Sequence, residues 1–224
     1  MFYPQGLPQK DELAYFATRF RTVELNNSFY RLPPPDAFLR WREATPPDFQ
    51  FAVKASRLIT HLLRLRDSMA PVALLLDHAG ALGPKLGPVL FQLPPTFQAD
   101  LPRLDRFLSL LPAGPRWVIE FRHPSWQTAA TYDRLGRGGV ALCVPVGGRI
   151  QPDLVTTAPF VYLRMHAGRG AEGGFSPGEL RGWAARILAL DRAGKEVYVY
   201  FNNDREGHAA RDGQRLLGLL GIER

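Results

Sequence analysis

The segment Arg116-Trp117-Val118-Ile119-Glu120-Phe121-Arg122-His123-Pro124-Ser125-Trp126 joins an apolar strand pattern to a charged end and a proline-anchored turn. Successive strand residues point to opposite faces, so Val118, Glu120 and Arg122 share one face while Ile119 and Phe121 share the other. A charged row beside an apolar row favours a strand whose carboxyl end opens into a polar cleft. The alternative is a surface strand that carries a salt bridge, and the other strands must decide between the two.

Apolar patterns of period two, or short continuous apolar runs, predict seven strands in all. They span residues 22–26, 49–55, 88–93, 118–121, 139–146, 160–166 and 196–203. Helical spacing predicts helices between them, at residues 11–20, 36–43, 100–111, 129–135, 177–193 and 208–220, and in a leucine-rich region that ends near residue 82. Strands that alternate with helices, without tandem hairpin signals, are typical of parallel βαβ units.

In six of these strands the polar residues fall on a single face and late in the strand. They are Glu24, Asn26, Lys54, Gln92, Glu120, Arg122, Arg164, His166 and Asn202. Barrel strands deliver side chains to the carboxyl-end mouth in this way. No strand is followed by the GxGxxG or GxxxxGK[ST] loop that marks nucleotide-binding open sheets. We therefore predict an α/β fold, a TIM-type (β/α) barrel of parallel strands, with residues 1–224 as a single domain.

The composition is that of a globular protein, with 46% hydrophobic and 22% charged residues. No apolar segment approaches the roughly 18 residues of a membrane span, so no membrane partner is expected. The N-terminal sequence Met-Phe-Tyr-Pro-Gln-Gly lacks a signal-peptide pattern. The single cysteine, Cys143, lies in an apolar run that predicts a core position and fits a reducing compartment. We expect a cytoplasmic protein.

The net charge of +7 favours acidic partners such as phosphates or nucleic acid. Of the 28 lysines and arginines only four are lysines, which makes Lys54, inside a strand pattern, conspicuous. The arginines are scattered through the helices rather than gathered in a basic arm. The charge therefore supports a small anionic or phosphorylated ligand more than it supports nucleic acid.

Short motifs spread over the whole chain resemble those of the YecE-like family, domain of unknown function 72. They are Phe2-Tyr3-Pro4, Thr22-Val23-Glu24-Leu25-Asn26-Asn27-Ser28-Phe29-Tyr30, Phe51-Ala52-Val53-Lys54, Ile59-Thr60-His61, Lys85-Leu86-Gly87-Pro88, Phe91-Gln92-Leu93-Pro94-Pro95, Glu120-Phe121-Arg122-His123-Pro124-Ser125-Trp126, Tyr162-Leu163-Arg164-Met165-His166 and Tyr200-Phe201-Asn202-Asn203-Asp204. The resemblance implies a TIM-barrel-like fold and a site but no reaction, because the family has no settled activity. The family pattern begins with a strand and a Gly-Thr-Ser-Gly-Trp-like turn upstream of Phe2-Tyr3-Pro4. We therefore expect the first barrel strand to be absent here, which leaves an open seam beside residues 22–26.

The polar residues at the predicted mouth suit catalysis on an anionic substrate. Glu24, Glu120 and His166 are the candidate catalytic residues, since two carboxylates on separate strands can serve as acid and base or share a divalent metal with a histidine. No local metal signature such as HExxH occurs, so the cofactor stays open, with a divalent metal as one option. The candidate substrate-binding residues are Asn26, Lys54, Gln92, Arg122, Arg164 and Asn202. The glycine-rich loop that begins at Gly168 follows a strand position near which such barrels often bind phosphate.

The leading prediction is a hydrolase-type enzyme that acts on a phosphorylated or otherwise anionic substrate. One alternative is a non-catalytic binding module for an anionic metabolite or nucleic acid. Another is a glycosidase that uses Glu24 and Glu120, although a neutral sugar has little use for three cations. A structural alternative is that the charged residues at the predicted mouth only form ion pairs that seal the barrel. Buried ion pairs seldom add net stability over apolar packing, which makes this alternative less favoured.

Overall fold

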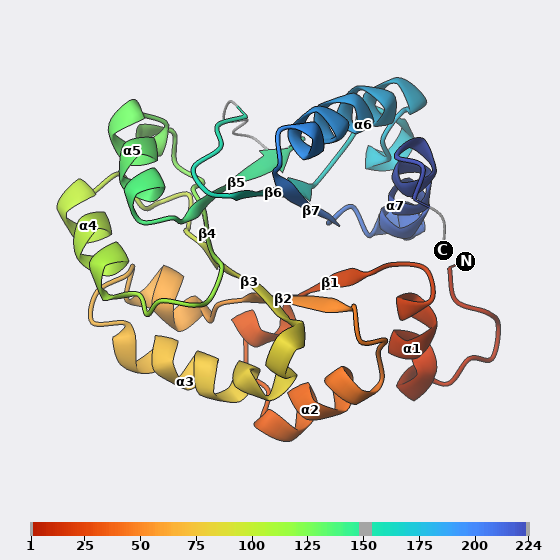
Figure 1. Cartoon of the computed structure of the whole chain (residues 1–224), viewed down its shortest axis with the longest axis horizontal. Helices are drawn as coiled ribbons and strands as arrows, with labels where there is room; N and C mark the ends of the chain where they lie inside the picture. Colours follow the sequence, from red (N-terminus) through yellow and green to blue (C-terminus); the bar gives the residue numbers. More distant parts are fainter. Residues whose placement is uncertain (1, 148–153, 223–224) are drawn as a thin grey trace.

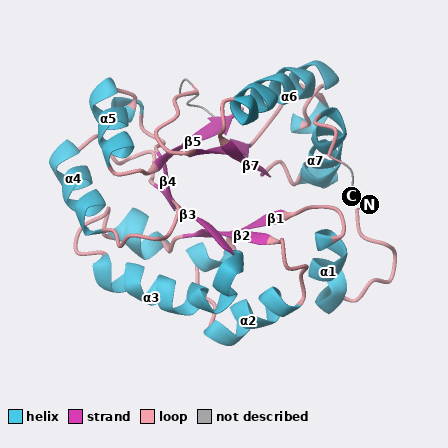
Figure 2. Cartoon of the chain, in the orientation of Figure 1, coloured by secondary structure: helices cyan, strands magenta, loops and turns pink. Residues whose placement is uncertain are grey.

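A computed structural model describes residues 2–147 and 154–222. Seven strands form one sheet in chain order and curve into a nearly closed barrel (Figures 1 and 2). They are β1 (Thr22–Leu25), β2 (Gln50–Lys54), β3 (Leu86–Gln92), β4 (Trp117–Glu120), β5 (Ala141–Val146), β6 (Phe160–Met165) and β7 (Glu196–Phe201). Every neighbouring pair is parallel. The predicted TIM-type barrel is confirmed.

Helices surround the barrel on its outside (Figure 2). The α-helices are α1 (Glu12–Ala17), α2 (Pro35–Glu43), α3 (Met69–Ala79), α4 (Leu101–Leu110), α5 (Ala129–Arg137), α6 (Pro177–Arg192) and α7 (His208–Leu219). Single turns are η1 (Gln9–Asp11), η2 (Asn27–Phe29), η3 (Leu58–Leu62), η4 (Gly80–Lys85), η5 (Pro124–Trp126), η6 (Ala171–Gly173) and η7 (Arg205–Gly207). The leucine-rich region predicted as helical is divided among η3, α3 and η4. In the described part of the chain, no helix has the length and apolar character needed to cross a bilayer.

Apolar side chains pack in two layers, as the alternation in the strands predicts. The outer layer lies between the strands and the helices and contains Phe51, Val53, Phe91 and Ile119 among its fully buried members. The inner layer fills the barrel and consists of Ala52, Leu90, Val118, Ala141, Cys143, Ala158, Phe160, Tyr162, Tyr198 and Tyr200. Small side chains come from β2 to β5 and large aromatic ones from β6 and β7, so the interior is packed rather than hollow.

The barrel is not closed by hydrogen bonds between β1 and β7. In the described residues, β1 pairs only with β2 and β7 only with β6. Side chains cross the seam instead, where the Thr22 and Tyr200 hydroxyls lie 2.8 Å apart. A cavity of about 460 Å³ opens along this seam, and Phe16, Phe20 and Phe201 are among the residues that line it.

Candidate functional site

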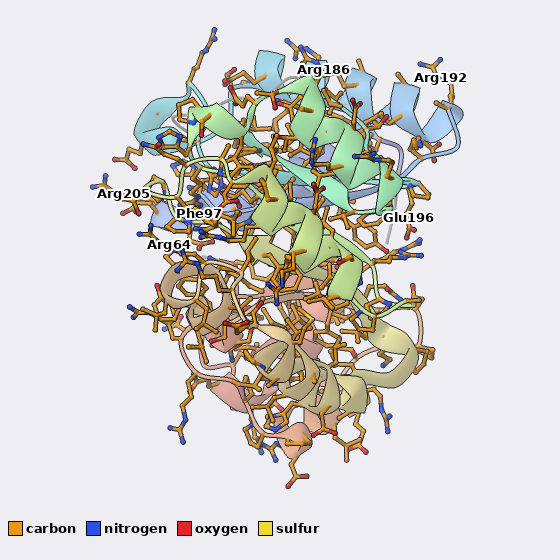
Figure 3. All side chains as sticks on the ribbon, turned by 90° about the vertical axis from the view of Figure 1, so that its left-hand side faces the viewer. Arg64, Phe97, Arg186, Arg192, Glu196 and Arg205 are labelled. Atoms are coloured by element: carbon orange, nitrogen blue, oxygen red, sulfur yellow. The ribbon has the colours of Figure 1, made fainter. Side chains whose placement is uncertain are left out.

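The carboxyl ends of the parallel strands meet on one face of the barrel, and this face carries the polar residues predicted from the sequence. Figure 3 shows Arg64, Phe97 and Arg205, from the segments after β2, β3 and β7, on the same side of the molecule. Glu196, the first residue of β7, lies on the opposite side. We call the open carboxyl end the mouth.

Arg164, near the end of β6, links the two carboxylates predicted from the sequence. Its side chain is only 3% exposed. Nε and Nη2 donate to Glu24 at 3.0 and 2.6 Å, while Nη1 donates to Glu120 at 2.7 Å. Burial alone lowers the pKa of Arg164, but the Glu120 and Glu24 carboxylates outweigh burial and raise this pKa above its ordinary value. One guanidinium thus joins β1, β4 and β6 across the barrel.

Glu24 is surrounded by hydrogen-bond donors. Besides Arg164, it accepts from the Tyr162 hydroxyl at 2.7 Å, from Asn26 Nδ2 at 3.0 Å and from Asn202 Nδ2 at 3.4 Å. Ionised carboxylates have about four lone-pair sites, so little capacity remains for a metal ion or a substrate proton. The sequence predicted Asn26 and Asn202 as site residues but not Tyr162. Tyr162 precedes Arg164 by two residues in β6 and therefore points to the same inward face.

Glu120 is fully buried at the end of β4. It accepts from Arg122 Nε at 2.6 Å and from Arg164 at 2.7 Å. Burial raises the pKa of Glu120. The charges of Arg164 and Arg122, together with their hydrogen bonds, outweigh burial, so the pKa lies below its ordinary value. The Cys143 thiol faces the same carboxylate, and burial together with Glu120 raises the pKa of this cysteine well above its ordinary value. Glu120 is therefore a carboxylate at neutral pH, and Cys143 is a core thiol, as predicted.

Lys54, at the end of β2, lacks a counter-charge. The residue is only 9% exposed, and Nζ lies 4.3 Å from the centroid of the Phe29 ring. Within residues 2–147 and 154–222, its ammonium group makes no hydrogen bond or ion pair. Burial, followed by the charge of Arg164, lowers the pKa of Lys54 to about 8, although Glu120 and Glu24 partly oppose this shift.

Other basic side chains lie near Lys54. The Arg122 side chain is 38% exposed, and only its Nε is engaged, with Glu120, among the residues that the structure describes. Burial lowers the pKa of His61, and the charges of Lys54, Arg122, Arg57 and Arg64 lower it further. We call Lys54, His61 and Arg122 the cationic side of the mouth.

Three further polar side chains lie at the mouth, near the ion pairs of Arg164 with Glu24 and Glu120. His166 Nε2 and Asn202 Oδ1 are buried without a hydrogen-bond partner among the described residues. Burial lowers the pKa of His166, so its imidazole is neutral at pH 7. Gln92 is buried at the end of β3, in register with Glu120. Unsatisfied buried polar atoms are the groups that a bound ligand or ordered water satisfies.

The structure bears on two options that the sequence left open. The described residues contain no cluster of three or more His, Cys, Asp or Glu side chains placed to hold a metal, and Glu24, Glu120 and His166 do not form one. The reason is that Arg164 occupies the space between the two carboxylates.

The glycine-rich loop after β6 does not offer a row of unpaired amides. The amides of Gly168 and Gly170 donate to carbonyls within the loop at 3.0 and 2.8 Å. The Arg169 amide donates to the Glu179 carboxylate at 3.0 Å. A phosphate cradle needs amides that point outward, and these point inward. The other predicted site residues do converge on the mouth, while their roles in binding and catalysis stay predictions.

Comparison with known proteins places the chain in a family of similar sequences. The family model described as "Protein of unknown function DUF72" matches residues 1–224. The UPF0759 protein YunF of Bacillus subtilis (strain 168) is 28% identical over 256 aligned residues, which cover 99% of this chain and 90% of YunF. The UPF0759 protein YecE of Escherichia coli (strain K12) is 39% identical over 115 residues, 51% of this chain. That match spans 42% of the length of YecE.

Solved structures agree as well. A DUF72 family protein from Thermotoga maritima MSB8 superposes with a TM-score of 0.86 at 28% identity, over 98% of this chain and 92% of that chain. A DUF72 family protein from Enterococcus faecalis V583 gives a TM-score of 0.82 at 20% identity, over 95% and 89%, and this second likeness supports the fold alone. Since the family model covers the entire sequence and the barrel is the same, the chain belongs to the DUF72 family.

Proposed function

We propose that the protein is an enzyme that binds a phosphorylated or otherwise anionic small molecule at the mouth and hydrolyses it. The observation that carries this proposal is the cationic side of the mouth, where the Lys54 ammonium group and the outer end of Arg122 have no hydrogen-bond or ion-pair partner among the described residues. Glu24 is bound to Arg164, and Glu120 is shared between Arg164 and Arg122, so the two carboxylates face three cations. An anionic ligand supplies the missing charge.

The geometry suggests a distinct role for each group. Arg122 presents its two terminal nitrogens to a phosphate or carboxylate, and Lys54 adds a point charge. Gln92 and Asn202 orient the ligand through hydrogen bonds. His166 is neutral and has an unpaired Nε2, which suits a base that activates water. Glu24 and Glu120 were predicted as acid and base, but their bonds to Arg164 suit them better to holding the charged network in place.

The alternative functions make different demands on the same residues. A glycosidase needs one carboxylic acid that stays protonated near neutrality, whereas Arg164 and Arg122 lower the pKa of Glu120. A non-catalytic module would use the same cationic side without turnover. Nucleic acid would require a wider basic surface and would bind with a steep salt dependence. A small anionic substrate in the cytoplasm fits the mouth best.

Replacing Arg122 by glutamine tests the proposal. Wild-type protein is expected to be stabilised against heat by a phosphate monoester from a screened panel, and to release inorganic phosphate from it. Arg122→Gln should weaken binding about tenfold to a hundredfold, because a charge-assisted hydrogen bond contributes roughly 1.5–3 kcal/mol. The matched control is Arg192→Gln, on the outside of α6 (Figure 3). Ligand binding and thermal stability are measured by thermal shift, and turnover by phosphate release.

Equal ligand affinity in Arg122→Gln and wild type would contradict the proposed site. Stabilisation by a phosphate ester without phosphate release, across the whole panel, would favour the non-catalytic module instead.

A further inference from the structure

The chain has four lysines, and one of them differs from the others in its surroundings. Lys10 is exposed. The Lys85 ammonium donates three hydrogen bonds to oxygens at the end of α2 and just beyond it. The Lys195 ammonium donates one to a backbone carbonyl. Only Lys54 combines burial at the mouth with an ammonium group that has no hydrogen-bond acceptor among the described residues.

The surroundings hold the Lys54 amine in place. The Ser28 hydroxyl donates to the Lys54 carbonyl at 2.7 Å and so fixes the end of β2. The Phe29 ring lies 4.3 Å from Nζ. The Phe29 ring also packs edge-on against the His61 ring, with the ring centroids 5.0 Å apart. An amine, an imidazole and the Arg122 guanidinium thus share one side of the mouth.

A substantial fraction of the Lys54 amine is neutral near pH 7.5. Burial and the charge of Arg164 lower the pKa of Lys54 to about 8. Roughly a quarter of the groups therefore carry a lone pair at pH 7.5, against about one in a thousand for a lysine with an ordinary pKa. A desolvated lysine beside another cation is the usual arrangement for a lysine nucleophile.

We propose that Lys54 is a nucleophile that forms an imine with the carbonyl carbon of an anionic aldehyde or ketone held by Arg122. The inference rests on the proposed anion site at Arg122 and narrows its substrate class to phosphorylated or carboxylated carbonyl compounds. In it, Lys54 acts as a neutral nucleophile in place of a point charge. The Nζ lone pair adds to the carbonyl carbon, and the carbonyl oxygen takes up a proton to give a carbinolamine. This oxygen then leaves as water with both hydrogens of the neutral amine, and a carbon–nitrogen double bond remains. The step is redox-neutral, and His61, on the same side of the mouth, is the candidate proton carrier.

Pyridoxal 5′-phosphate, an aldehyde with a phosphate, is a suitable probe. After brief incubation at pH 7.5 and reduction with cyanoborohydride, the labelled lysines are located by peptide mass spectrometry. Lys54 should be labelled at least about tenfold faster than the exposed Lys10, because a larger fraction of its amine is neutral. Inorganic phosphate should slow the labelling of Lys54 but not that of Lys10. Lys54→Met should remove this label, and the control Lys10→Arg should keep it.

Pyridoxal, which lacks the phosphate, separates the two proposals. Slow labelling of Lys54 by pyridoxal 5′-phosphate, with phosphate still stabilising the protein against heat, would overturn the imine and leave the anion site standing. If both aldehydes label Lys54 rapidly and phosphate does not compete, the proposal that Lys54 is a nucleophile stands and the proposed anion site is contradicted. Fast labelling by the phosphorylated aldehyde alone supports both. Circular dichroism of Lys54→Met confirms that the loss of label does not come from unfolding.

Discussion

At the scale of single residues, the mouth buries charge in two different ways. Arg164, Glu24 and Glu120 satisfy one another, so each has a partner for its charge. Lys54 has none among the described residues, and burial works against its charged form. Uncompensated buried charge destabilises a fold, so its presence at a concave strand end points to function rather than to stability.

Replacing Lys54 by methionine is expected to raise the free energy of unfolding at pH 7. The pKa of Lys54 is about 8 in the folded protein against an ordinary 10.5, so below pH 8 the lysine is protonated in both states and the folded state bears the full cost of its charge. Between pH 8 and 10.5 the folded state loses its proton first and the cost disappears. The gain should be on the order of 1–2 kcal/mol after discounting for partial solvent screening, and should shrink towards pH 10.

Urea unfolding at pH 7 and pH 10 measures this gain. The exposed Lys10→Met provides the matched control and should change stability by less than about 0.5 kcal/mol. A lower stability of Lys54→Met at pH 7 would mean that the ammonium makes a favourable interaction in the folded protein.

At the scale of elements, α6 shows how a local signal also organises a loop. Ser176 and Glu179 form a capping box, with Pro177 in the first turn. The Glu179 carboxylate accepts from the Ser176 and Arg169 amides. The same side chain therefore begins the helix and holds the glycine-rich loop after β6.

Alanine substitutions at Ser176 and Glu179 should have different effects. Ser176→Ala removes one cap and should lower stability by about 1 kcal/mol. Glu179→Ala should lower it by at least as much and should also speed amide exchange across the loop that begins at Gly168, since Arg169 loses its acceptor. Urea unfolding and hydrogen-exchange mass spectrometry measure these effects, with the exposed Arg181→Ala as control. Equal loop exchange in the two variants would show that Glu179 does not hold the loop.

At the scale of the whole molecule, the barrel is most firmly built opposite the seam. Every residue of β4 is buried, and all but the first of β3. In β1 only Glu24 is buried, and β7 begins with an exposed residue. Each of these two outer strands pairs along one edge only within the described residues. The seam is joined by side chains, among them the buried Arg164–Glu24 pair and the Thr22 and Tyr200 hydroxyls.

Backbone amides should therefore exchange faster in the outer strands than in the middle of the sheet. We expect protection in β1 and β7 to be roughly tenfold to a hundredfold lower than in β3 and β4, because local opening at an unpaired edge breaks fewer hydrogen bonds. Native-state hydrogen exchange followed by NMR measures this directly. Uniform protection across the seven strands would show that the seam is as firmly closed as the rest of the barrel.

The sequence alone was sufficient for the barrel and for the inward positions. The alternation of side chains along the strands predicted that Glu24, Lys54, Glu120 and Arg164 lie on the inward face. The residues Ser176 to Glu179 carry the signal for the start of α6. Both signals depend only on neighbours along the chain. Which of these side chains would pair was decided by the tertiary structure. Curvature of the sheet brings Arg164 to Glu24, 140 residues away in the chain, and leaves Lys54 without a partner among the described residues. The same holds for the pKa of Lys54 and for the amides of the loop after β6, which point inward. Both depend on distances between residues that are far apart in the sequence, and no local sequence pattern contains those distances.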